Sequence, residues 1–445
     1  MAKLRSISAI AGPSIGVFLL ATLSTLFIIR VVSDLGADAV AAVTAGQRVL
    51  FLFFAVLMGV SAGATALVSR AWGAGDLLLA GCFARISLLM SLVSVATVAT
   101  IVIAIAPSVA EFFQLQGAAR EQAIVYIRWV SVFAITQSVV IVLGTVLRAV
   151  GDAMTPLYIG LLANVGSVLA AWVLTKGFWG IPGQGVSGAA IGWGSAYLLC
   201  ALLYLGQWRR GKLRLPWTTA VPITLPRLQL FARIAWPAVT EQLVMQFAML
   251  GFAWFVGFHG KHAFAAYGIG LALLSVAAVI ALGFSIAASA IVGQSIGEGH
   301  QDRARAAAWT ALKAGLALMS TVAVILLLAA EPVAALMVTD PPVMELTVQF
   351  VRVLAFLLPL LTVDLILAGA MRGAGDTRFP MLIGIGAAVF VRLPLATVII
   401  IQEMAVVWLF GILLVDQAVK TSVLCWRFRS NRWLRRLPVG AADGN

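Results

Sequence analysis

The chain has 445 residues, of which 62% are hydrophobic and 11% charged, and its mean hydropathy is +1.05. Soluble domains carry roughly 45–50% apolar and about 25% charged residues, so this composition excludes an ordinary soluble protein. The formal net charge is +13. The basic residues gather in short loops between apolar runs, which indicates membrane topology rather than nucleic-acid binding. Cys82, Cys200 and Cys425 stand far apart and predict neither a disulfide framework nor a metal site.

Apolar runs of spanning length follow one another along the whole chain. A helix that crosses a bilayer needs about 20 apolar residues. The expected spans cover residues 9–33, 39–70, 80–105, 121–146, 153–176, 185–206, 229–258, 263–293, 305–330, 346–370, 378–400 and 404–424. The sequence therefore predicts an all-α, polytopic membrane protein with twelve transmembrane helices.

The second half of the chain repeats the first at an ungapped offset of 224 residues. The offset superposes Pro13 on Pro237, Gly36 on Gly260, Gly73 on Gly297, and Arg148-x-x-Gly151-Asp152 on Arg372-x-x-Gly375-Asp376. An even number of spans in each copy gives both copies the same orientation, so we expect two six-helix lobes related by a parallel internal repeat. The expected parts are an N-lobe over 1–206, a cytoplasmic linker over 207–228, a C-lobe over 229–426 and a basic cytoplasmic tail over 427–445.

The loop charges predict the orientation of the spans. Basic residues occupy one predicted face, namely Lys3, Arg5, Arg70, Arg148, Arg209, Arg210, Lys212, Arg214, Arg227, Arg303, Arg305, Arg372, Arg378 and the basic residues from Arg427 to Arg436. The opposite loops carry Asp34, Asp38, Glu111, Glu331, Asp340 and Glu345. Because loops rich in lysine and arginine stay in the cytoplasm, we expect both termini to be cytoplasmic.

Glycine pairs mark the second span of each half. Gly73-x-Gly75 follows the first of these helices, as expected where a chain leaves a helix through a left-handed residue. Upstream, Gly59-x-x-x-Gly63 places two small residues on one helical face, which favours close helix packing in lipid.

Four segments carry a family resemblance. They are Leu35-Gly36-Ala-Asp-Ala-Val-Ala-Ala-Val43, Gly293-Gln294-Ser-Ile-Gly297-Glu-Gly299, Met371-Arg372-Gly373-Ala-Gly375-Asp376-Thr377 and Gly185-Val-Ser-Gly188-Ala-Ala-Ile191. Their order and spacing resemble those of multidrug and toxic compound extrusion (MATE) transporters. The resemblance covers essentially the whole chain.

The resemblance implies a bacterial cytoplasmic-membrane protein that exports organic, often cationic, compounds in exchange for protons or sodium. It implies a monomer with a small-molecule substrate and the lipid bilayer as its partners, with no nucleic acid, cofactor, metal or catalytic residue. The family commonly has an aspartate in the first span, where this chain has Ile28. Asp34 aligns with the following loop, so that role is not transferred to it.

Charged residues inside the predicted spans are candidate functional groups, because burial in hydrocarbon is costly without a cavity or a partner. Glu241 lies about a dozen residues into the seventh span, and similar transporters often carry a coupling acid there. We expect Glu241 to bind the coupling ion, with Gln242, Gln246 and Phe247 near the substrate. Ring faces such as that of Phe247 attract cations, although packing against lipid is the more common role.

Other intramembrane polar residues are less specific. Asp364 matches a second coupling acid of similar transporters, or else bonds a neighbouring side chain. Arg392 is a candidate partner for an acid and a candidate substrate contact, and Gln137 and Asn164 either line an N-lobe cavity or bond between helices. In the last span, Asp416 and Lys420 form an i, i+4 pair that we interpret as structural.

Two alternative functions remain open on the sequence. A flippase for lipids or lipid-linked oligosaccharides would need a cationic central cavity, formed by several of Arg30, Arg48, Arg128, Arg352 and Arg392. A membrane-embedded enzyme is disfavoured, because the three histidines, His259, His262 and His300, fall in or beside loops and no nucleophile, metal or phosphate-binding motif occurs.

Overall fold

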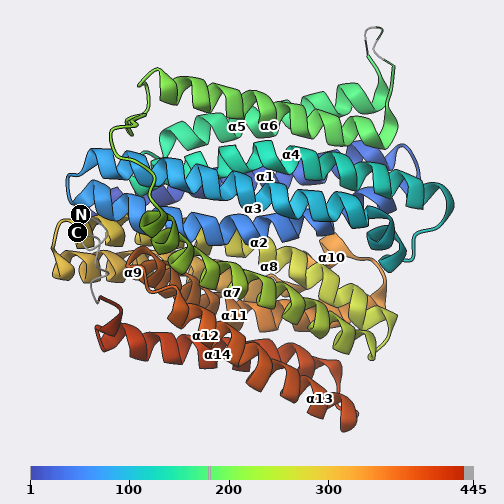
Figure 1. Ribbon diagram of the computed structural model, residues 1–445. Coiled ribbons are helices and arrows are strands. Elements are labelled where there is room, and N and C mark those ends of the chain that lie inside the picture. The colour runs from blue at the N-terminus through green and yellow to red at the C-terminus, as the bar shows by residue number, and fades with distance from the viewer. Residues whose placement is uncertain (1, 179, 181, 435–445) are drawn as a thin grey trace. The chain divides into compact units, whose positions relative to one another are not determined.

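A computed structural model describes residues 2–178, 180 and 182–434, and the elements in this part of the chain are helices. The basic residues expected at Arg435 and Arg436 lie outside it. The first half contains α1 (Ala2–Ser33), α2 (Ala37–Gly73), α3 (Leu77–Phe112), α4 (Gly117–Ala149), α5 (Met154–Lys176) and α6 (Gly185–Arg209), coloured blue to green in Figure 1.

The second half contains α7 (Leu225–Gly257), α8 (Lys261–Gly297), α9 (Gln301–Leu328), α10 (Ala330–Met337), α11 (Pro341–Gly373), α12 (Arg378–Ala387), the π-helix η1 (Ala388–Arg392), α13 (Leu393–Ile401), α14 (Val406–Arg429) and the short η2 (Arg432–Leu434). Helices α12, η1 and α13 run on as one span. Within the described residues, twelve helices are long and apolar enough to cross a membrane, which confirms the predicted number.

The helix bounds repeat at the offset found in the sequence. Helices α2 and α8 each have 37 residues, and α4 and α11 each have 33. The turn after α2 uses Gly75 at φ +78°, and the turn after α8 uses Gly299 at φ +82°. Both glycines adopt a left-handed backbone, which a side chain would strain. The internal repeat and the turn prediction are therefore confirmed at the level of individual helix ends.

The helices extend beyond the predicted apolar runs. The run expected over 346–370 begins earlier, at Pro341, because proline is tolerated in the first turn of a helix. The run expected over 305–330 ends at Leu328, and the separate helix α10 follows it. Polar residues in the first and last turns are invisible to a hydropathy pattern, so the expected limits were too short at most ends.

The chain forms two compact units. The N-terminal unit is Gly16–Val239, and the C-terminal unit combines Met1–Ile15 with Thr240–Asn445. The two boundaries fall inside α1 and α7 at equivalent positions of the repeat. The beginning of α7 therefore belongs to the N-terminal unit, and the beginning of α1 belongs to the C-terminal unit.

Small residues allow the first part of α7 to pack closely on α2, and the first part of α1 to pack closely on α8. In the N-terminal unit, a Cβ on Gly59 would lie 2.6 Å from the backbone nitrogen of Val239, and one on Gly63 would lie 3.2 Å from the Cβ of Ala235. In the C-terminal unit, a Cβ on Gly283 would lie 2.3 Å from a side-chain carbon of Ile15. The predicted packing role of the Gly59-x-x-x-Gly63 pair is therefore confirmed.

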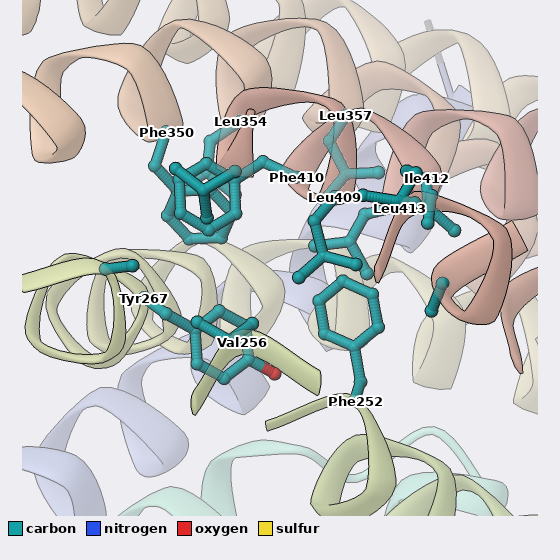
Figure 2. Packing of buried hydrophobic residues seen from close by; sticks show 14 residues of the cluster. Phe252, Val256, Tyr267, Phe350, Leu354, Leu357, Leu409, Phe410, Ile412 and Leu413 are labelled. Atoms are coloured by element: carbon teal, nitrogen blue, oxygen red, sulfur yellow. The ribbon is translucent and has the colours of Figure 1, made fainter. Parts of the chain in front are cut away.

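An aromatic core holds part of the C-terminal unit together. Phe252 of α7, Tyr267 of α8, Phe350 of α11 and Phe410 of α14 are all buried, and their rings meet as Figure 2 shows. The centroids of Phe350 and Phe410 are 4.5 Å apart, a favourable separation for an aromatic pair. This core fixes four helices that also supply the candidate site.

A charged cavity in the C-terminal unit

Helix α7 places Glu241 at its midpoint, one turn after Pro237. The side chains of Glu241, Gln242, Met245 and Met249 all face one cavity. The spacing of three and four residues between most of them puts them on one helical face. The buried carboxyl of Glu241 thus opens on a cavity rather than on the apolar surface.

The cavity has a volume of about 230 Å³ and is formed within the C-terminal unit. Helix α11 contributes Asp364 and Arg372, which lie two turns apart, and α14 contributes Gln417 and Lys420. Arg392 enters from η1, where one π-helical turn interrupts the regular hydrogen bonding. Leu357 and Leu413 belong both to the cavity wall and to the aromatic core, so that core closes one side of the cavity.

Glu241 forms a buried ion pair with Arg372. The guanidinium Nη2 donates to Oε1 of Glu241 at 2.6 Å, and the side chains are 11% and 17% exposed for Glu241 and Arg372 respectively. The other carboxylate oxygen of Glu241, Oε2, is buried and has no hydrogen-bond partner among the described residues. One oxygen of Glu241 is thus paired with a cation, and the other has no partner among the described residues.

A second group of charges lies beside this pair. Arg392 donates from Nη2 to Oδ2 of Asp416, and Lys420 lies 3.4 Å from the same oxygen. Asp364 accepts a hydrogen bond of 2.6 Å from Nε2 of Gln417 and lies 3.9 Å from the Lys420 amine. Three acids and three bases therefore balance around the cavity: Glu241, Asp364 and Asp416 against Arg372, Arg392 and Lys420.

The structure brings together four of the predicted site residues, namely Glu241, Gln242, Asp364 and Arg392. Gln246 and Phe247 do not line this cavity. Gln246 is exposed and Phe247 is 70% exposed, because five and six residues after Glu241 the helix presents another face. A substrate contact at either residue stays a prediction.

The two predicted residues of the N-terminal unit make internal hydrogen bonds. Asn164 is buried and donates from Nδ2 to the carbonyl of Gly160 at 2.7 Å, while its own carbonyl accepts from Ser24 of α1 and from Ser167. Gln137 bonds to the side chain of Tyr197 in α6. These contacts fit the hydrogen-bonding alternative for both residues, and a role in substrate binding remains untested.

Three residues of this site were not predicted from the sequence. Arg372 was treated as a motif residue and Lys420 as half of a local pair, and Gln417 was not considered. Arg372 and Glu241 are 131 residues apart, and only the fold brings them together. The motif around Arg372 offered the one available signal, because it places a base at the end of a span that also carries Asp364.

The arginines that a flippase would need do not gather in this cavity. Of the five candidates, only Arg392 lines it, and Arg392 is paired with Asp416. Arg352 pairs with Glu331, Arg30 pairs with Asp34, and Arg48 and Arg128 are exposed. The cavity of the C-terminal unit is therefore charge-balanced rather than cationic.

The first span carries no acid at the position where similar transporters have one. Ile28 is buried in an apolar cluster with Val32 and Val130. Asp34 lies beyond the end of α1, where hydrogen bonds from Lys176 and Arg30, at 2.7 and 2.5 Å, hold its pKa at about 2, below its usual value of 3.8. Asp34 thus acts as a fixed anion outside the spans.

The described residues contain no group of three or more histidine, cysteine, aspartate or glutamate side chains arranged to hold a metal ion. The cavity instead mixes carboxylates with nitrogen donors. Arginine and lysine offer hydrogen-bond donors and no lone pairs, so a bound cation at this site would depend on the few carboxylate and amide oxygens.

Twelve candidate spans, an internal repeat and charged groups facing a cavity lined by residues of those spans define the class of the protein: it is a polytopic membrane transporter of small molecules built from two six-helix halves. The MatE family model matches residues 13–173 and 237–398, one match in each half. The chain belongs to the MatE family. Membership of this transporter family, rather than any missing motif, sets the chain apart from enzymes.

Relatives and solved structures agree with this assignment. The chain is 24% identical over 413 residues to a probable multidrug resistance protein NorM of Thermotoga maritima, covering 89% of this chain and 86% of the relative. It is 27% identical over 372 residues to an FAD transporter of Shewanella oneidensis, covering 82% and 81%.

Two solved structures share the fold. A MOP superfamily transporter from Pyrococcus furiosus, described as having a binding pocket of reverse polarity, superposes with a TM-score of 0.90 at 20% identity, over 100% of this chain and 97% of that one. An outward-facing multidrug resistance MATE transporter gives a TM-score of 0.88 at 21% identity, over 98% and 97%. At these identities the structures support the fold alone.

Proposed function

We propose that this protein is a secondary active multidrug efflux antiporter. It exports organic, cationic compounds in exchange for protons or sodium by alternating access. Glu241 and Asp364 bind the coupling ion. The names of the NorM relatives support multidrug export, and the cavity in the C-terminal unit supports a coupled mechanism.

One observation carries the proposal: Glu241 is a buried carboxylate that faces a cavity with one oxygen paired and the other free. A structural ion pair would normally satisfy both oxygens, because a buried acceptor without a partner is costly. The free Oε2 provides a place for a proton or a sodium ion without first breaking the bond to Arg372.

The charge balance around the cavity supports competition between the coupling ion and the cargo. With Glu241 ionised, the six charges around the cavity cancel, and a cationic cargo meets no excess positive charge. A proton or sodium ion at Glu241 adds one positive charge and disfavours a cationic cargo by Coulomb repulsion. The ion and the cargo therefore exclude one another, which is the condition for exchange. Asp364, held by Gln417, lies on the same cavity and provides the second carboxylate.

The experiment is efflux from proteoliposomes under an imposed gradient. A cationic dye is loaded into vesicles, and its movement is followed under a pH gradient and, separately, under a sodium gradient. The wild type is expected to move dye against its gradient under one of the two ions, whereas Glu241→Gln is expected to lose this movement. Full gradient-driven transport by Glu241→Gln would overturn the assignment.

Leu250→Ala provides the control on the same helix. It changes a side chain of α7 that is 58% exposed and does not line the cavity. Retained gradient-driven transport in Leu250→Ala would separate the effect of Glu241 from a general effect of altering α7.

We further propose the setting in which this exchange occurs. The two repeated halves act as the lobes, with the linker and both termini in the cytoplasm, in the cytoplasmic membrane of a bacterium, and one chain suffices. Loop charges support the orientation, and the bacterial NorM relatives support the membrane. In a variant without Cys82, Cys200 and Cys425, single cysteines introduced at Gln301 and Asp38, on opposite predicted faces, should label with an impermeant reagent from opposite sides.

A further inference from the structure

The N-terminal unit buries a guanidinium that has no carboxylate partner. Arg148, in the last turn of α4, is only 7% exposed. Its Nη2 donates to the hydroxyl of Thr145 at 3.2 Å, and its Nε is buried without a partner. No ion pair to Arg148 forms among the described residues. A buried charge normally requires a counter-charge, and Arg148 has no carboxylate in that position.

The internal repeat identifies the missing component. Arg372 is the repeat mate of Arg148, and it pairs with Glu241 in the C-terminal unit. The position equivalent to Glu241 is Val17. The first half of the chain has kept the arginine and replaced the acid with an apolar residue.

The surroundings of the two sites correspond. A Cβ on Gly384 would lie 3.6 Å from the Cγ of Glu241, and a Cβ on its mate Gly160 would lie 3.1 Å from a methyl of Val17. The helix pair that holds Glu241 thus has an equivalent that holds Val17. The difference between the sites is therefore chemical, and it leaves one positive charge uncompensated in the N-terminal unit.

Two hydroxyl groups lie beside the guanidinium. The hydroxyl of Thr145 accepts from Arg148 and donates to the carbonyl of Ile141 at 2.9 Å. A Cβ on Gly144 would meet Nη1 of Arg148 at 3.5 Å, a carbon of Pro156 at 3.6 Å and the hydroxyl of Tyr204 at 3.7 Å, all ordinary contact distances. Asp152, in the turn after α4, accepts hydrogen bonds from the backbone and hydroxyl of Thr155 at 3.1 and 2.7 Å and makes no ion pair with Arg148 among the described residues.

We propose that Arg148 and Tyr204 form an anion site that binds an oxyanion of the cargo, a carboxylate or a phosphate, with Thr145 orienting the guanidinium. An arginine beside a hydroxyl donor is a combination that recognises such groups. The inference rests on the proposed function, since it assigns to the N-terminal unit a site for cargo that carries an acidic group. The incoming anion supplies the charge that Glu241 supplies in the other half.

Equilibrium binding to purified protein in lipid-free detergent tests the site without any gradient. The probe is benzoate, compared with its neutral isostere benzamide by titration calorimetry. Wild-type protein is expected to bind benzoate about tenfold or more tightly than benzamide, the effect of a charge-assisted hydrogen bond. Arg148→Gln is expected to remove the difference. Equal binding of the two probes to the wild type, or an unchanged ratio in Arg148→Gln, would overturn the proposal.

A glycine pair provides a test that keeps Arg148 in place. Gly144→Ala places a methyl group in the space beside the guanidinium at ordinary contact distances and should weaken benzoate binding. Gly166→Ala, whose Cβ would lie 3.5 Å from that of Ala196, adds the same methyl to another helix and should not. Equal effects of the two substitutions would count against the site, and so would no effect of either.

A phospholipid headgroup offers the same chemistry as a cargo phosphate. Titration with phosphatidylglycerol separates the two sources. If this lipid binds in an Arg148-dependent manner and excludes benzoate, the occupant is the lipid and the cargo assignment is wrong. Because none of these titrations involves a gradient, their failure is distinguishable from loss of Glu241-dependent transport, which tests the proposed function.

Discussion

The ion pair between Glu241 and Arg372 should be strongly coupled, and a double-mutant cycle measures that coupling. Arg372→Gln removes the cation and leaves a buried carboxylate without its nearest counter-charge. Glu241→Gln removes the anion and leaves a buried guanidinium. The double variant removes both charges and leaves two neutral amide side chains.

The magnitude follows from the geometry. Two unit charges at the observed 2.6 Å attract by about 6 kcal/mol at an effective dielectric of about 20. Desolvation offsets part of this attraction, and removing one partner of a buried pair costs about 3–5 kcal/mol. Each single variant should therefore lose about 3 kcal/mol or more of unfolding free energy. The double variant should lose much less than the sum of the two.

The assay is equilibrium unfolding in mixed micelles, with the exposed pair Arg352 and Glu331 as the control cycle. That pair is 3.2 Å apart with side chains 53% and 76% exposed, so its coupling should be about 0–1 kcal/mol. If the losses at Glu241 and Arg372 add to within about 0.5 kcal/mol, the two groups are not an ion pair and the reasoning about charge balance fails.

Two further predictions concern packing and pH. Gly59→Ala should destabilise the protein by about 1–3 kcal/mol, because the added methyl group overpacks against Val239. Gly251→Ala, whose Cβ would have its nearest neighbour 3.8 Å away, should stabilise the protein by about 0.5–1 kcal/mol. Equal effects of the two substitutions in thermal unfolding would contradict the close contact at Gly59. The anion at Asp34 contributes stability above its unfolded-state pKa of 3.8, and this contribution is lost as the pH falls through the folded-state pKa of about 2. The difference in unfolding temperature between wild type and Asp34→Asn should therefore shrink as the pH falls from above 3.8 to about 2, and a difference of unchanged size over that interval would refute the pairing.

Apolar run length and the repeat were sufficient to predict the number of spans and their division into two similar halves. Twelve runs predicted twelve spans, and the mates of Gly75 and Arg148 predicted a symmetry that the helix bounds reproduce. The crossing of α1 and α7 between the two units was not predicted, because it depends on which neighbours a helix contacts rather than on its own pattern.

The candidate site was only partly predictable. Glu241 stood out because a charge within an apolar run is rare, and a finer use of helical periodicity would have placed Gln246 and Phe247 on another face. The partner Arg372 lies at a helix end, where basic residues are common, so its pattern carried no distinguishing signal. Arg392, which pairs with Asp416, lies in the π-helical turn η1, and no periodicity analysis anticipates such a turn.

The central claim is that ion and cargo compete at Glu241, and ion displacement by cargo measures it most directly. A saturating cationic dye is added to purified protein in weakly buffered detergent, while a pH indicator and a sodium electrode follow the released ion. We expect about one proton or one sodium ion to be released per dye bound by the wild type, and none by Glu241→Gln. Dye binding without ion release in the wild type, or equal release from both proteins, would contradict the account.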